Sequence, residues 1–207
     1  MDFLPLFPLN LVAFPGEKLN LHIFEPRYIQ LITECLEADT PFGIPVYMPN
    51  QQMDFGTSLR VLEVSQRYDD GRMDIRTEGL QIFRLLSFIN PVERKLYAGG
   101  QIAYQEHESS TELLPGLLDH LKKLYQHLQT NVEFNERSEN FSYQIAHKIG
   151  LSLEEEYELL QIPQELERQR FISRHLNRIM PVIQELEKTK ERIRLNGHFR
   201  NFDPLNF

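Results

Sequence analysis

The segment Leu-His-Ile-Phe-Glu-Pro-Arg-Tyr, residues 21–28, places a histidine, a carboxylate, a guanidinium and two aromatic rings within eight positions. A histidine near an acid can perform general acid–base chemistry, but no nucleophile or metal-binding pattern accompanies this one. Aromatic rings and arginine are the side chains enriched at the hot spots of protein interfaces. We therefore expect a partner-binding surface for a peptide or another protein, formed by His22, Phe24, Arg27 and Tyr28.

The same eight residues also fit a purely structural corner between a strand and a helix. Leu21 and Ile23 alternate with polar residues as in a half-buried strand, and Pro26 suits the first position of a helix. In this interpretation, which is the simpler one, Tyr28 packs back on the core and Arg27 only forms an ion pair or a cap. Both interpretations stay open at this stage, while catalysis by these residues is a distant third.

Motifs for catalysis and nucleotide binding are missing from the rest of the sequence. No glycine is followed by lysine, so the phosphate-binding loop is absent, and no Gly-x-Ser-x-Gly segment occurs. His107-Glu108 begins like a zinc-protease motif, but Thr111 stands in the place of the second histidine. One cysteine cannot build a cysteine-rich zinc site. We therefore expect no enzymatic activity, no catalytic residue, no metal and no cofactor.

Composition and charge narrow the possible partners. A formal net charge of −8 gives a nucleic-acid backbone no general attraction. The apolar N-terminus is interrupted by prolines and has no basic residue, unlike a signal peptide, and no apolar run is long enough to span a bilayer. A single cysteine, Cys35, suits a reducing compartment. These features predict a cytoplasmic protein that binds neither nucleic acid nor membrane.

Strands and turns are predicted up to about residue 107. Residues 14–17, Phe-Pro-Gly-Glu, fit a type II turn, and apolar residues alternate with polar ones in 19–23 and again in 42–48. Residues 59–89 resemble a hairpin around a two-residue turn at Asp70-Gly71, and 96–106 supply another strand. A helix that begins at Pro26 interrupts this sheet, with Cys35 as a small buried residue on its apolar side.

From Ser109 onwards the apolar period becomes helical. Ser109-x-x-Glu112 and Ser152-x-x-Glu155 are capping-box patterns that predict two helix starts. The last helix should run from about 164 to 195, bend near Pro181 and pack its apolar stripe, 172–186, on other helices. The aromatic tail, 197–207, is expected to fold back or to dock on a neighbouring chain, which leaves open a homo-oligomer formed through the C-terminal region. The sequence thus predicts an α+β fold, with a β-rich subdomain over 1–108 and a helical subdomain over 109–207.

Three segments resemble a known family, in its order along the chain. LPLFPLNLVAFPGEKLNLHIFEPRYIQLI (4–32), DGRMDIRTEGLQIFRL (70–85) and SYQIAHKIGLSLEEEYELLQIPQELERQRFISRHL (142–176) are similar to the opening, the central hairpin and the helical part of the Lon substrate-binding domain. This is the N-terminal domain of the Lon protease, and the chain resembles its stand-alone members in particular. The resemblance implies a β-rich pseudobarrel similar to the PUA fold, followed by a helical subdomain.

The resemblance also implies a function. In the full protease this domain recognises protein substrates, whereas separate ATPase and peptidase domains, for which these 207 residues leave no room, do the chemistry. We therefore expect a non-catalytic module that binds unfolded or partly folded polypeptides, or a partner protein. By fold analogy, the alternative is an RNA-binding module, which would require convergence on one face of Arg60, Arg67, Arg72, Arg76 and Arg84. An enzyme acting on a small molecule would require a deep polar pocket.

Overall fold

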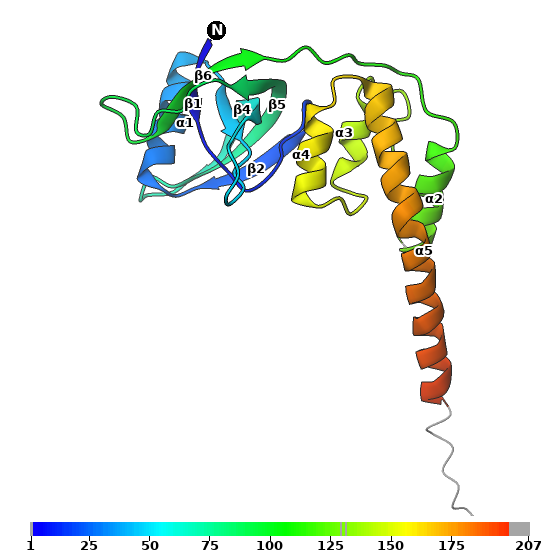
Figure 1. Cartoon of the computed structure of the whole chain (residues 1–207). Coiled ribbons are helices and arrows are strands. Elements are labelled where there is room, and N and C mark those ends of the chain that lie inside the picture. Colours follow the sequence, from blue (N-terminus) through cyan, green and yellow to red (C-terminus); the bar gives the residue numbers. More distant parts are fainter. Residues whose placement is uncertain (1, 129, 131, 199–207) are drawn as a thin grey trace, which may run out of the picture.

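The computed structural model describes all residues except 1, 129, 131 and 199–207. Seven elements form a β-rich first part: β1 Asp2–Leu6, β2 Lys18–Ile23, α1 Pro26–Ala38, β3 Phe42–Pro45, β4 Phe55–Arg67, β5 Met73–Leu85 and β6 Ala98–Tyr104. Four helices follow: α2 Leu117–His127, α3 Phe141–Ala146, α4 Leu153–Gln161 and α5 Glu165–His198. Figure 1 shows the sheet and the helices side by side, which confirms the predicted α+β fold.

The sheet closes on itself and leaves one strand at its edge. Its order is β2-β5-β4-β3-β1-β6, and an additional pairing of β5 with β6 joins five of these strands into a ring. The strand β2 lies outside this ring and pairs with β5 alone. A closed sheet has few exposed backbone groups, so β2 supplies an edge that the rest of the pseudobarrel lacks.

Local turn chemistry explains how the sheet is connected. Gly16 has a φ of 78°, and the Glu17 N–H donates to the Phe14 carbonyl, as predicted for the turn before β2. The β4–β5 hairpin is also present, but the predicted two-residue turn is wrong. Its loop has three residues, because the Tyr68 N–H donates to the Arg72 carbonyl and Gly71 occupies the left-handed region at φ 89°. Glycine at this position suits a three-residue hairpin loop.

Helix α1 packs its apolar side against the sheet. Pro26 occupies the first turn, where a missing N–H costs nothing, and Asp39 ends the helix in a left-handed conformation. Leu31 and Ile32 are fully buried in a core cluster that includes residues of β2, β3, β4 and β5. Burial raises the pKa of the Cys35 thiol to about 11, as expected for an inert buried cysteine.

The capping box predicted at Ser109 is wrong, whereas the one at Ser152 is confirmed. Helix α2 begins only at Leu117, after Gly116 with a φ of 81°. Pro115 explains the delay, because a residue before proline avoids the helical region, and the Leu114 N–H instead bonds Gln169 at 2.7 Å. Helix α4 has no such obstacle, and Ser152 and Glu155 bond each other's backbone N–H groups.

The long helix α5 packs on the other helices over only part of its length. Ile172, Leu176 and Met180 are buried, and Ile183 is half-buried. Leu186 is 57% exposed and Ile193 66% exposed, so the prediction of a packed stripe as far as 186 is wrong. Figure 1 shows why: α5 continues beyond α2 and projects from the rest of the molecule. Docking was predicted for the tail 197–207, of which 197 and 198 belong to α5 and 199–207 lie outside the described residues.

The sheet and the helices share a core. One cluster of buried residues includes Val12, Phe14 and Ile82 from the β-rich part together with residues of all four helices after β6. The predicted boundary at residue 108 follows the last strand closely, since β6 ends at Tyr104. The division into two subdomains at this residue stays a prediction, because the strands and the helices after them are packed on each other. None of the described helices has the length and apolar character needed to cross a membrane.

Candidate functional site

The corner between β2 and α1 presents an aromatic ring to solvent. Phe24 is 59% exposed, and its ring stacks on that of His22 with centroids 5.9 Å apart. The two residues are two positions apart at the end of a strand, where alternate side chains point to the same side of a sheet. Together they form an aromatic step on the outer face of β2.

Hydrogen bonds to the neighbouring hairpin hold His22 in place. Its Nδ1 lies 2.6 Å from a carboxylate oxygen of Asp74, the residue opposite it on β5, and the Tyr68 hydroxyl donates to the other oxygen at 2.8 Å. The hydrogen bonds from His22 and Tyr68 lower the pKa of Asp74. A fixed carboxylate orients the imidazole, so the ring on which Phe24 stacks is fixed as well.

Arg27 and Tyr28 take different positions at this corner. The Arg27 guanidinium bonds Glu25 at 2.7 Å and lies 4.6 Å from the centre of the Tyr28 ring. Tyr28 is only 8% exposed and stacks on Phe7 at 3.8 Å. The structure therefore brings the side chains of His22, Phe24 and Arg27 to the surface. Tyr28 does not reach the surface. Its ring packs in the core, as the structural interpretation expected, and lies beneath the Arg27 guanidinium.

Ion pairs neutralise most of the arginines that could have formed a basic groove. Arg60 bonds Glu78 and Arg76 bonds Glu63 across the strands, and Arg72 bonds Asp70 in the hairpin loop. The remaining two lie far apart. Arg84 lies opposite Phe55 at the start of β4, and Arg67 is the last residue of β4, so the two arginines lie at opposite ends of this 13-residue strand. All five arginines lie on the β4–β5 hairpin or its loop, but three of them are paired with carboxylates, which leaves this hairpin little net attraction for an RNA backbone.

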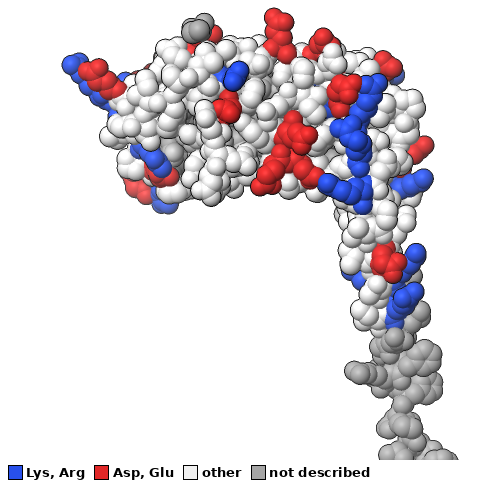
Figure 2. Space-filling model, viewed as in Figure 1, with Lys and Arg blue, Asp and Glu red and all other residues white. Residues whose placement is uncertain are grey.

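Basic side chains also form a short column over α5 in Figure 2, but acidic side chains lie beside it over α4. On these helices Arg178 of α5 pairs with Glu155 of α4, and Arg170 pairs with Glu167, both on α5. Mixed charge of this kind gives a phosphate backbone little net attraction.

A second candidate surface lies where the sheet meets the helices. Two depressions of about 610 and 710 Å³ adjoin there and share the lining residues Pro15, Leu80, Asn140 and Tyr143. On one side His107 bonds the Tyr143 hydroxyl at 2.9 Å, and its pKa is lowered to about 4 by burial and by the nearby Arg168. The imidazole of His107 is therefore neutral at pH 7. We call this surface the junction groove.

On the other side of the junction groove, His147 bridges two carboxylates. Its ring nitrogens lie 2.7 Å from Glu156 of α4 and 3.2 Å from Glu17 of the turn before β2. Burial alone would lower the pKa of His147, but the hydrogen bonds to Glu156 and Glu17 outweigh it and raise the pKa to about 10. The imidazolium therefore ties the sheet to the helices at neutral pH.

Neither surface has the parts of a catalytic centre. Among the described residues of the junction groove, His107 bonds Tyr143 and His147 bonds Glu17 and Glu156, and neither histidine bonds a Ser, Thr or Cys side chain that could act as a nucleophile. Within the described part of the chain, no group of three His, Cys, Asp or Glu side chains could hold a metal ion. Both surfaces offer apolar rings and polar edges, which suit the binding of a polypeptide.

The comparisons with known proteins agree with this picture. A family model described as the ATP-dependent protease La (LON) substrate-binding domain matches residues 3–178. A Lon N-terminal domain protein from Xanthomonas campestris superposes with a TM-score of 0.68 at 24% identity, covering 83% of this chain and 97% of that chain. The N-terminal domain of the Mycobacterium avium complex Lon protease gives 0.62 at 12% identity, covering 85% and 98%. At these identities the two structures show a shared fold.

Proposed function

This chain belongs to the Lon substrate-binding domain family, and we propose that it binds unfolded or partly folded polypeptide segments, without catalysis, at the corner of His22, Phe24, Arg27 and Tyr28. The observation that carries the proposal is the Phe24 ring, which is 59% exposed yet held by stacking on a hydrogen-bonded histidine. An exposed, pre-organised ring can bury apolar area on binding at a small entropic cost. Arg27 is fixed over Tyr28 and paired with Glu25, and its remaining guanidinium N–H groups would orient the bound segment by donating hydrogen bonds to its carbonyl groups.

Removing the Phe24 ring should weaken peptide binding. We expect the Kd for a fluorescently labelled unfolded peptide to rise roughly tenfold in Phe24→Ala, which corresponds to about 1.4 kcal/mol of binding free energy. Arg27→Ala should weaken binding in the same direction. Fluorescence anisotropy measures the Kd, and thermal melts of each variant show whether the fold survives.

Phe88→Ala is the matched control, because Phe88 is also exposed, at 40%, but lies on the loop before β6. Unchanged binding by Phe24→Ala, or an equal loss in both variants, would contradict the proposed site. Variants in the junction groove, such as Leu80→Ala, would then identify the alternative surface. Binding of single-stranded RNA in place of peptide would favour the alternative function, against which the paired arginines and the net charge of −8 argue.

We place the protein in the cytoplasm, where a buried free thiol such as Cys35 persists. The described helices include none that could span a bilayer, which is compatible with this location. Cell fractionation tests the assignment, and recovery of the protein with the membranes would contradict it.

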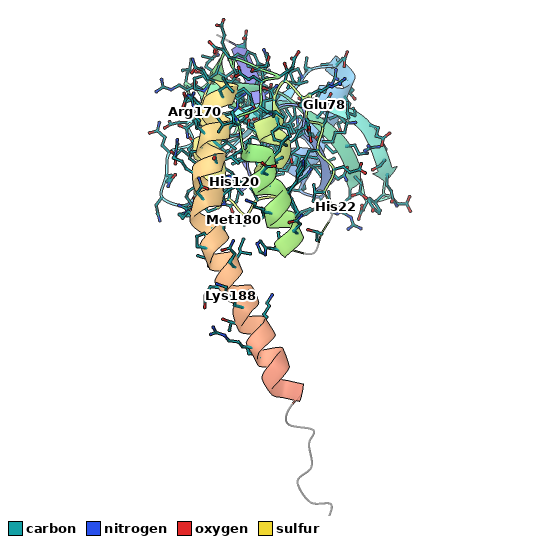
Figure 3. All side chains as sticks on the ribbon, turned by 90° about the vertical axis from the view of Figure 1, so that its right-hand side faces the viewer. His22, Glu78, His120, Arg170, Met180 and Lys188 are labelled. Carbon is teal, nitrogen blue, oxygen red and sulfur yellow. The ribbon has the colours of Figure 1, made fainter. Side chains whose placement is uncertain are left out.

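The projecting part of α5 is the proposed contact with a second copy. Its axis changes direction close to the labelled Met180 in Figure 3, beside Pro181, as predicted. Beyond this bend Val182, Leu186 and Ile193 expose apolar side chains that a second α5 would cover. We expect Leu186→Asp combined with Ile193→Asp to turn a dimer into a monomer in sedimentation equilibrium. A wild-type chain that is monomeric at every concentration would contradict this contact.

A further inference from the structure

The outer edge of β2 carries unpaired backbone groups. The Gly79 N–H donates to the Glu17 carbonyl at 2.9 Å, and hydrogen-bonded positions alternate along an antiparallel pair. Leu19, Leu21 and Ile23 therefore direct their backbone groups towards β5. The backbone N–H and C=O groups that point away from β5 belong to Lys18, Asn20 and His22. Within the described part of the chain, none of these outward groups has a hydrogen-bond partner outside the sheet.

The two faces beside this edge differ in polarity. On the outer face, Lys18, Asn20 and His22 are exposed and lead to the aromatic step at Phe24. On the inner face, Leu19 and Leu21 are only half-buried, although they pack against the core beneath α1. A strand added here would cover the half-exposed leucines with one set of its side chains. Its other set would lie along the outer face, where one side chain would reach the Phe24 ring.

We propose that the bound polypeptide adds to the free edge of β2 as a further strand and places an apolar side chain on the step formed by His22 and Phe24. The inference rests on the proposed peptide-binding function and specifies how the segment is held. Its ligand is an extended segment of about six residues, the length of β2, with apolar residues at alternate positions and no proline at the paired ones. Backbone pairing suits unfolded chains of many sequences, because every sequence offers the same N–H and C=O groups.

The edge can be blocked by a proline without breaking the sheet. The N–H of Asn20 points away from β5, so Asn20→Pro removes an outward donor and leaves the bonds to β5 in place. Gln52→Pro is the control, since Gln52 lies in the exposed loop before β4. The probe is a labelled 12-residue peptide in which Val alternates with Ser and Lys and one central Ser is replaced by Phe, so that Val can cover the leucines and Phe can reach the Phe24 ring. We expect Asn20→Pro to raise its Kd at least tenfold, whereas Gln52→Pro should change it less than twofold.

A modified peptide tests the same pairing with the wild-type protein, in case Asn20→Pro fails to fold. N-methylation of all central residues removes the donors from both edges of the peptide and should raise the Kd at least tenfold. Two further peptides are methylated at one or the other set of alternate residues. The peptide that keeps the donors facing β2 should change the Kd less than threefold, and the other should lose affinity as the fully methylated peptide does. Full methylation without a loss of affinity would overturn strand addition.

The outcomes separate this inference from the proposed function. If Phe24→Ala weakens binding but folded Asn20→Pro does not, the corner binds peptide without strand addition. The inference of strand addition is then wrong, and the proposed peptide-binding function stands. If the wild-type protein binds none of the peptides, the proposed function fails with it. If Asn20→Pro instead converts a dimer into a monomer and the peptide does not compete with dimerisation, the edge belongs to a second copy. That result would overturn the inference.

Discussion

Replacing Arg168 with methionine is expected to lower the free energy of unfolding by about 3–5 kcal/mol, the usual cost of breaking a buried ion pair by removing one partner. Arg168 and Glu165 are both completely buried, and the guanidinium bonds the carboxylate at 2.9 Å. The guanidinium also lies 4.3 Å from the centre of the Tyr143 ring. Its other hydrogen-bond acceptors are the carbonyl oxygens of Ile162, Pro163 and Glu108 and the side chains of Asn140, Ser142 and His107.

This loss of stability is large because methionine leaves buried hydrogen-bond acceptors without their donor. Glu165 would keep only the hydrogen bonds from Ser142 and Gln169, so a carboxylate would remain buried without a cation. Three backbone carbonyl groups would lose a donor as well. Arg168 connects the segment after β6, helix α3 and the start of α5, so its loss should loosen the junction of sheet and helices.

Urea unfolding followed by circular dichroism measures this change. Arg170→Met is the matched control, because Arg170 lies two residues away on α5 and forms an exposed pair with Glu167, at 51% and 44% exposure. Exposed pairs contribute at most about 1 kcal/mol, so this variant should stay close to the wild type. Equal stability of the two variants would contradict the importance assigned to the buried network. In the double variant Glu165→Gln, Arg168→Met, part of the loss should be recovered, since no buried charge is left unpaired.

Phe14→Ala is expected to destabilise the protein by about 3–5 kcal/mol, the typical cost of deleting a buried phenylalanine ring. Phe14 has no exposed surface, and its ring lies 4.9 Å from Tyr143 of α3 and 4.9 Å from His147. The residue comes from the turn before β2, so this one side chain fills space between the sheet and the helices. Its removal leaves a cavity at the junction of sheet and helices. The neighbouring rings of Tyr143 and His147 are held by hydrogen bonds to other residues, so they cannot move to fill it.

The shape of the unfolding curve is part of this second prediction. One core cluster contains residues of both the sheet and the helices. Phe14→Ala should therefore lower the midpoint of the unfolding transition, and the protein should still unfold in a single transition. Phe24→Ala is the control, since the same ring is removed from a position with 59% exposure, and it should cost less than about 1 kcal/mol. Two separate transitions in either variant would mean that the sheet and the helices fold independently, which the shared core argues against.

Features that depend on a few neighbouring residues were predictable from the sequence. The turn at 14–17 follows from proline and glycine at adjacent positions, and the capping box at Ser152 follows from two side chains that bond the backbone three residues apart. The β4–β5 hairpin was predictable as well, although the length of its loop was not. At Ser109 the same capping pattern failed, because Pro115 and a hydrogen bond from Leu114 to the distant Gln169 compete with the helix.

The residue types available for binding and the elements that carry them could be read from the chain alone, because apolar periodicity and capping are local properties. Which of these residues reach the surface depends on packing between distant segments. Tyr28 is buried because Phe7, from another segment, stacks on it. The junction groove joins Pro15, Leu80 and Tyr143, whose positions in the sequence give no signal of their proximity. The free edge of β2 follows from a strand order that alternation of side chains cannot encode, since alternation specifies the two faces of a strand and leaves its neighbours undetermined.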